Sequence, residues 1–216
     1  MGTDYIIARK LAEMAEKKSD VIFTPTMPFG NADHHMGFPG TVSIGDEALY
    51  LAMKNITGSL YKHGARRFVF LNGHGGNTVA LTKVGAELNR MGAFAAILNW
   101  WLVAPALNPA WAGGHGDAQE TSAVLAINKD GVDFDALKQY SFTGLSEKLP
   151  VDGLGTVKFN GVSVAVPRSV DKVTDLGWYG KGDPKSASAE MGNEMLEAVS
   201  NFVAEFVKEF EKAEMR

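Results

Sequence analysis

Residues 68–77, FVFLNGHGGN, decide the fold of this chain, because an apolar run ends there in a turn that carries one histidine among three glycines. The run Phe68–Leu71 predicts a buried strand, Asn77–Met91 a helix, and Ala93–Leu98 a second buried strand. A strand, a helix and a strand at this spacing form a βαβ unit, whose two strands are normally parallel. We therefore expect His74 at the carboxyl end of a strand, where ligands collect in open parallel sheets.

Helical and extended patterns alternate along the rest of the chain, joined by short segments that contain glycine. The segment after Ala93 is the most apolar, but Asn99 and Pro105 interrupt it, so we expect buried sheet followed by a loop up to Leu107. The patterns predict an α/β fold of a single domain, residues 1–216, with a mostly parallel sheet flanked by helices. A first helix is expected after Thr3 as N-cap, with Ile7, Leu11 and Met14 on one face. Further helices are expected at Asp46–His63, Ala118–Asn128 and Ala187–Lys212, and further strands at Val21–Phe23 and Val162–Val166.

The composition limits the classes of function. The chain has 216 residues, 45% of them hydrophobic, which is enough for one substantial core. Its formal net charge of -4 provides no basic surface for a phosphate backbone, so nucleic acid is not an expected partner. No stretch is apolar for the roughly 20 residues that a membrane span needs, and the N-terminus has no secretory signal pattern. Because the chain has no cysteine, any metal must be bound by imidazole and carboxylate, and a cytoplasmic location is expected.

The turn Asn72–Asn77 gives the strongest indication of chemistry. Glycines around one imidazole let the backbone approach closely and leave room for an ion or a substrate. We therefore take His74 as a candidate ligand, and Gly75, Gly76 and Asn77 as candidate substrate contacts. The alternative is a glycine-rich turn with an incidental histidine.

A second glycine loop, Gly113–Asp117, runs into the helix expected from Ala118. If this helix begins near Asp117, Glu120 lies in its first turn and His115 just ahead of it, so both side chains can face one cavity. Imidazole with carboxylate is the ligand set of zinc and manganese hydrolases. The alternative is a capping arrangement, in which Asp117 and Glu120 only interact with the helix dipole.

A third motif, Asp33–Thr41 (DHHMGFPGT), contains two adjacent histidines. Adjacent side chains point apart and seldom bind one ion together, so we interpret His35 as a pocket residue and His34 as a surface or interface residue. His63 lies at the end of an expected helix, where a cation is favourable. This motif therefore adds one candidate substrate contact, His35.

Five short motifs follow one another in a fixed order: Gly2-Thr3-Asp4, His35 with Phe38-Pro39-Gly40-Thr41, the Asn72–Asn77 turn, His115 with Glu120-Thr121-Ser122, and Gly180–Pro184. This order and spacing resemble the creatininase (creatinine amidohydrolase) family over nearly the whole chain. The resemblance implies a three-layer α/β/α fold and a site for two divalent metal ions, zinc or manganese. Asp4 would bridge the two ions, His74 would ligate one of them, and Glu120 would complete the site. The resemblance also implies that His115 delivers a proton to the leaving group while the metals activate water. A homo-oligomer, a hexamer, is implied as well.

Two features depart from the family pattern. The family carries a Glu-x-His pair on a strand ahead of its GTD segment, so we expect a chain that starts at Met1 to be a shortened form of a longer protein rather than one that has lost part of its metal site. Creatinine hydrolases carry a carboxylate in the turn, where this chain has Gly75 and Gly76, so creatinine is not an expected substrate. Asp117 replaces a small residue and should alter the pocket or add a ligand. Trp100, Trp101 and Trp111 either wall a pocket for a flat or cyclic substrate, with Trp101 as the candidate contact, or belong to the core or a subunit contact.

The expected function is metal-dependent hydrolysis of an amide-like or cyclic C–N bond in a small molecule, with no nucleic acid or membrane as partner. One alternative is a hydrolase of a ring C–C or lactone bond in a sugar or inositol pathway, which needs no protonated nitrogen and should depend less on His115. The other alternative is a non-catalytic oligomeric paralogue that keeps the fold only.

Overall fold

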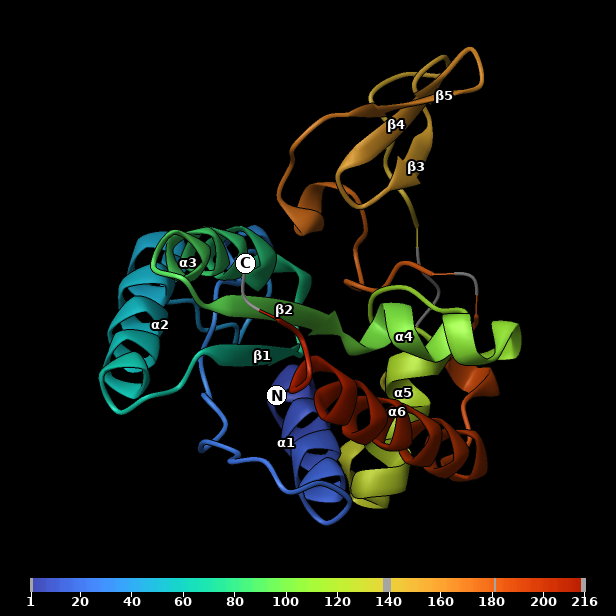
Figure 1. Ribbon diagram of the computed structural model, residues 1–216. Helices are drawn as coiled ribbons and strands as arrows, with labels where there is room; N and C mark the ends of the chain where they lie inside the picture. The colour runs from blue at the N-terminus through green and yellow to red at the C-terminus, as the bar shows by residue number, and fades with distance from the viewer. Residues whose placement is uncertain (1, 138–140, 181, 215–216) are drawn as a thin grey trace.

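The computed structural model describes residues 2–137, 141–180 and 182–214, and Figure 1 shows the arrangement of its elements. The helices are α1 Thr3–Glu16, α2 Gly45–Lys62, α3 Thr78–Arg90, α4 Trp100–Leu107, α5 Ala118–Ile127 and α6 Ala189–Phe210. The strands are β1 Arg67–Asn72, β2 Phe94–Asn99, β3 Val151–Gly153, β4 Thr156–Phe159 and β5 Val162–Ala165. Two 3-10 turns position the site, η1 Asp33–His35 and η2 Gly75–Asn77.

The strands β1 and β2 form a parallel pair in the middle of the molecule, in a register that ends with Asn72 opposite Asn99. Side chains alternate along β1, so Phe68 and Phe70 face one hydrophobic core and Leu71 faces the other. Helices α2 and α3 cover the first face, and α1 and α6 cover the second (Figure 1). The three-layer α/β/α fold is thereby confirmed.

The C-terminal helix α6 carries the apolar stripe that closes the second core. Met195, Val199 and Val203 recur at helical spacing and are buried against Ile7 and Leu11 of α1. Burying one such side chain contributes roughly 1.5–3 kcal/mol, so this stripe fixes α1, which carries Asp4, against the body of the protein.

Predicted element boundaries lie within two residues of the observed ones, with two errors of element type. Val21–Phe23 is not a strand: no described strand pairs with it, and Ile22 is 93% exposed. The segment after β2 is the helix α4 rather than a loop. Pro105 has no N–H to donate to the carbonyl of Trp101, and Gln119 Nε2 donates to that oxygen instead, at 3.3 Å.

The late strand is confirmed as β5, and it pairs with β4 in a small antiparallel sheet, order β3-β4-β5. This sheet projects away from the parallel pair (Figure 1). Among the described residues, no helix combines the length and the apolar character that crossing a bilayer requires.

Candidate functional site

The turn after β1 is fixed to the ends of both parallel strands. Asn72 Oδ1 accepts hydrogen bonds from the backbone N–H of His74, at 3.2 Å, and from Asn77 Nδ2, at 3.1 Å. Asn72 Nδ2 donates to Asn99 Oδ1 at 2.9 Å, where β2 ends. His74 therefore lies at the carboxyl end of a parallel strand, the place that the sequence predicts for it.

Two glycines of the turn are needed because neighbouring backbone approaches closely. A Cβ on Gly73 would lie 2.4 Å from the carbonyl oxygen of Asp4, and a Cβ on Gly76 would lie 2.2 Å from the carbonyl oxygen of Asn31. Asn77 Oδ1 also accepts a hydrogen bond from the backbone N–H of Asn31, at 2.9 Å. The turn thus holds the start of α1 on one side and the loop around Asn31 on the other. Asn77 uses both ends of its side-chain amide in this positioning.

Asp4 and His74 meet directly in the structure. Asp4 Oδ2 lies 3.3 Å from His74 Nδ1. The other ring nitrogen, Nε2, is buried and has no hydrogen-bond partner among the described residues. A buried polar atom without a partner is costly, and an imidazole with one nitrogen on a carboxylate and the other free is the usual arrangement of a metal-binding histidine. The residues present therefore fit a divalent metal ion.

Two further histidines, His34 and His35, converge on this pair. The ring of His34 stacks on that of His74, with centroids 5.4 Å apart and an interplanar angle of 11°. His35 lies 4.2 Å from His34 and 5.4 Å from His74, centroid to centroid. One ligand nitrogen from each ring lies within 4.8 Å of the others. The interpretation of His34 as a surface or interface residue is wrong, because consecutive side chains in the 3-10 turn η1 are about 120° apart rather than opposed.

The loop before α5 brings His115 to the same place. The backbone of His115 pairs with that of Tyr179 through N–H to carbonyl bonds of 2.7 and 2.8 Å, and its ring stacks on His35 at a centroid distance of 4.2 Å. Glu120, in the first turn of α5, accepts a hydrogen bond from the backbone N–H of Gly116 at 2.8 Å. The structure thus gathers the predicted residues from four segments. The compact group of ligand atoms among the described residues, however, is the three histidines rather than Asp4, His74 and Glu120.

Burial dominates the electrostatics of the two carboxylates. Desolvation, followed by repulsion from Asp4, raises the pKa of Glu120 to about 8. Desolvation also raises the pKa of Asp4 to about 6, against an opposing attraction from His34. At pH 7 Glu120 therefore favours its neutral form, whereas Asp4 is still mainly ionised, and a nearby positive charge would favour the ionised form of both.

Burial lowers the pKa values of the histidines, because desolvation disfavours the charged imidazolium. Desolvation and then the neighbouring His115 lower the pKa of His35 to about 3, and desolvation and then His74 lower the pKa of His115 to about 4. The pKa values of His34 and His74 are also lowered, chiefly by desolvation. Four neutral imidazoles at neutral pH offer lone pairs to a metal or to a proton.

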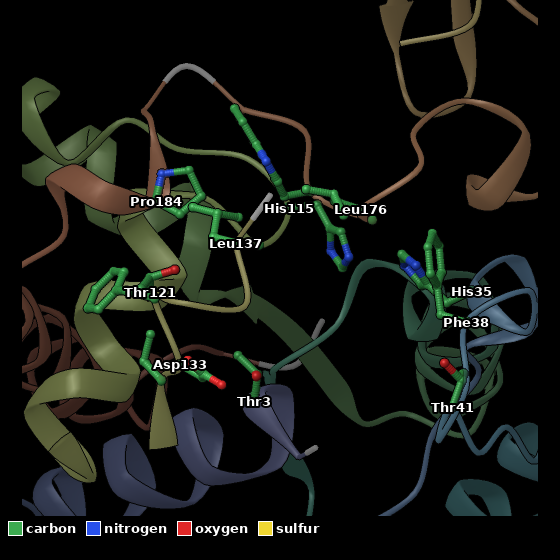
Figure 2. Close-up of a pocket in the computed structure, with 15 residues that line it drawn as sticks. Thr3, His35, Phe38, Thr41, His115, Thr121, Asp133, Leu137, Leu176 and Pro184 are labelled. Atoms are coloured by element: carbon green, nitrogen blue, oxygen red, sulfur yellow. The ribbon is translucent and has the colours of Figure 1, made fainter. Parts of the chain in front are cut away.

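A cavity of about 540 Å³ opens beside this cluster, and Figure 2 shows His35 and His115 on its wall. Thr3 and Thr121 contribute hydroxyl groups, and Asp133 contributes a carboxylate. Most of the apolar wall was not predicted from the sequence, since it lies in segments with no periodic pattern. The apolar lining residues are Phe38, Val132, Phe134, Leu137, Leu176, Trp178 and Pro184.

Of the six predicted substrate contacts, His35 lines this cavity. The other five, Gly75, Gly76, Asn77, Trp101 and Asp117, do not. Asp117 is completely buried as the N-cap of α5, with Oδ1 accepting from the backbone N–H of Gln119 at 3.0 Å, which is the capping alternative. A Cβ on Gly180 would lie 1.9 Å from Asp117 Oδ2, so this carboxylate packs tightly under the loop that holds His115. Trp101 borders the turn instead, since its ring lies 3.9 Å from where a Cβ on Gly75 would be.

The sequence of this chain is similar to those of several known proteins. The family model described as creatinine amidohydrolase matches residues 1–207. The mycofactocin precursor peptide peptidase of Mycolicibacterium smegmatis is 33% identical over 192 residues, which cover 89% of this chain and 68% of that protein. The corresponding peptidase of Mycobacterium ulcerans is 31% identical, and there the chain spans 61% of the relative's length. The creatinine amidohydrolase of Pseudomonas putida is 24% identical, covering 97% of this chain and 82% of that one.

Solved structures agree with the fold. A putative creatinine amidohydrolase from Bacteroides fragilis superimposes with a TM-score of 0.73 at 24% identity, covering 99% of this chain and 82% of the other. Creatininase structures of a Zn–Zn type and of a manganese form superimpose with TM-scores of 0.69 and 0.70, each at 24% identity and covering 97% of this chain and 83% of the other. Motifs, fold and relatives lead to one conclusion: the chain belongs to the creatininase family of metal-dependent hydrolases.

Proposed function

We propose that this chain hydrolyses an amide-like or cyclic C–N bond of a small molecule, with divalent metal ions at a site formed by His74, which binds through Nε2, by Glu120, and by Asp4, whose carboxylate orients the ring of His74, and with His115 as the proton shuttle. The observation that carries the proposal is the orphan Nε2 of buried His74, whose Nδ1 faces Asp4 Oδ2 at 3.3 Å. The charge of a metal would also offset the desolvation cost of ionising the two buried carboxylates, because an adjacent cation favours their ionised form.

When bound at these residues, the metal ions would lower the pKa of a water molecule and polarise the carbonyl under attack. Imidazole suits zinc, and carboxylate oxygen also suits manganese. Both metals occur in creatininase structures of the same fold. The donor set of this chain is therefore compatible with either.

His115 is placed to move the proton that amide hydrolysis requires. Its lowered pKa, about 4, keeps the ring neutral at pH 7, so it can accept a proton from the attacking water. It then donates that proton to the departing nitrogen, which leaves as an amine while the acyl carbon keeps the new oxygen. The ring lies on the cavity wall next to His35, so both can contact a bound substrate.

The cavity favours a substrate with an apolar part next to its scissile bond, because aromatic and aliphatic side chains form most of its wall. A short peptide-like amide fits this description and agrees with the peptidase names of two relatives. The homohexamer that the family resemblance implies and the cytoplasmic location expected from the absence of cysteine belong to the same proposal. Exposed apolar side chains such as Leu51 and Val79 support association with further copies.

The test compares zinc-loaded, manganese-loaded and chelated protein against short peptide amides, formamides, creatinine and lactones. His115→Ala should lower amide hydrolysis by about 10²- to 10⁴-fold and lactone hydrolysis less, because an alkoxide needs less help in leaving than an amine. His63→Ala, at the exposed end of α2, is the matched control and should leave both rates unchanged. Absence of metal-dependent hydrolysis of every substrate, or an amide rate in His115→Ala equal to that of the control, would refute the proposal.

A further inference from the structure

His34 lies outside the ligand set of the proposed function, yet its ring faces the metal-binding side of His74. Its ligand nitrogen lies within 4.8 Å of those of His35 and His74, and two nitrogens on one tetrahedral zinc ion are about 3.4 Å apart. The carbonyl of His34 accepts a hydrogen bond from Ser169 Oγ at 3.4 Å, which connects η1 to the 169–171 segment. This contact helps to hold the backbone that carries the His34 ring.

Gly76 shows where the ring edges point. A Cβ built on Gly76 would lie 3.0 Å from His34 Cε1 and 3.0 Å from His74 Nε2. Both atoms therefore lie beside Gly76, and Cε1 is bonded to both nitrogens of the His34 ring. The orphan nitrogen of His74 is thus close to the edge of the His34 ring.

Asp4 gives the group its direction. By facing His74 Nδ1 at 3.3 Å, its carboxylate leaves Nε2 as the nitrogen that is free to bind. If the three rings were only packed together, that buried nitrogen would remain without a hydrogen bond, which is unfavourable. A cation shared by the three rings removes this cost.

We propose that His34 is a metal ligand and that, with His35 and His74, it forms an all-imidazole face that selects zinc over manganese. Three nitrogen donors match the preference of zinc, copper and nickel, whereas manganese prefers carboxylate and water oxygen. The inference deepens the proposed function, on which it rests only for the presence of a metal, since metal binding can be measured without any substrate.

The test titrates the full, chelator-treated chain with zinc and with manganese in competition with a chromophoric chelator, and compares His34→Ala with the control His63→Ala. We expect His34→Ala to lose zinc affinity by about 100-fold, because even residues that only support a ligand contribute 10- to 100-fold. Manganese affinity should change much less, and His63→Ala should match the wild-type chain in both titrations. Zinc affinity of His34→Ala within threefold of the control would overturn the assignment.

A second measurement on the wild-type chain covers the case in which His34→Ala does not fold. Long-range ¹H–¹⁵N spectra of the histidine rings should show zinc-dependent shifts of one nitrogen in each of three rings, His34, His35 and His74. A zinc-bound spectrum in which the ring of His34 is unshifted contradicts the inference. Zinc bound by three imidazoles without hydrolysis of any substrate would leave this inference standing and refute the proposed function, so the two failures are distinguishable.

Discussion

Glu120→Gln tests the electrostatics of the site without any substrate. The glutamine has the shape of the glutamate, and its carbonyl oxygen can still accept the hydrogen bond from the backbone N–H of Gly116. What changes is the cost of a buried negative charge, which Glu120 bears whenever it ionises in the folded, metal-free protein. The variant should therefore be more stable than the wild-type protein at alkaline pH, although it loses a proposed ligand.

The magnitude follows from the pKa. Glu120 has a folded pKa of about 8 against an ordinary value of 4.5, so its contribution to stability is fully present below pH 4.5 and is lost as the pH rises through 8. Between pH 5 and pH 9 this loss amounts to roughly 4 kcal/mol. Asp4 and the histidines also titrate, but they are common to both proteins, so the difference between variant and wild type largely isolates Glu120.

The assay is urea unfolding at pH 5, 6, 7, 8 and 9 in the presence of a metal chelator. The stability of the wild-type chain relative to Glu120→Gln should fall steadily across this range. Glu194→Gln, on the exposed face of α6, is the control for loss of one carboxylate and should follow the wild type. Parallel curves for the wild type and Glu120→Gln from pH 5 to 9 would refute the burial argument.

Three further outcomes are expected. Gly76→Ala should destabilise the fold by about 1–3 kcal/mol in urea unfolding, because its Cβ would lie 2.2 Å from the carbonyl oxygen of Asn31. The control Gly58→Ala, which has open space and a helical backbone in α2, should stabilise the fold by up to about 1 kcal/mol. Asn77→Ala should cost about 2 kcal/mol, for two lost hydrogen bonds, and should speed hydrogen exchange at the backbone N–H of Asn31; unchanged exchange there would contradict the positioning role. Zinc at a hundredfold excess over its Kd should raise the free energy of unfolding by about 2.7 kcal/mol, and a value independent of zinc would speak against a site in the folded state.

The sequence predicted well the parts of the fold that depend on local periodicity. The apolar stripe that includes Met195, Val199 and Val203 and the strand that ends at Asn72 each bury one face, so the pattern alone located them. The segment around Ile22 failed because three apolar residues are too few to distinguish a strand from a loop. The helix with Pro105 failed because its substitute hydrogen-bond donor, the side chain of residue 119, is distant in sequence.

The sequence indicated candidate site residues but not their geometry. Motif spacing indicated His74 and Glu120, which follow glycine-rich segments at the end of a strand and the start of a helix, whereas Asp4 came from the family resemblance. His34 was misplaced because neighbouring side chains point apart only in an extended chain, and this loop instead forms a 3-10 turn. The apolar cavity wall, including Trp178, has no periodic signal, because segments far apart in the sequence bring it together.

The central claim is that buried imidazole and carboxylate groups from separate segments bind one metal centre. The most direct measurement is anomalous scattering at the zinc absorption edge from crystals of the zinc-loaded protein. We expect the strongest peak about 2.1 Å from His74 Nε2. A well-ordered zinc ion elsewhere on the protein, with no peak beside that nitrogen, would contradict the claim.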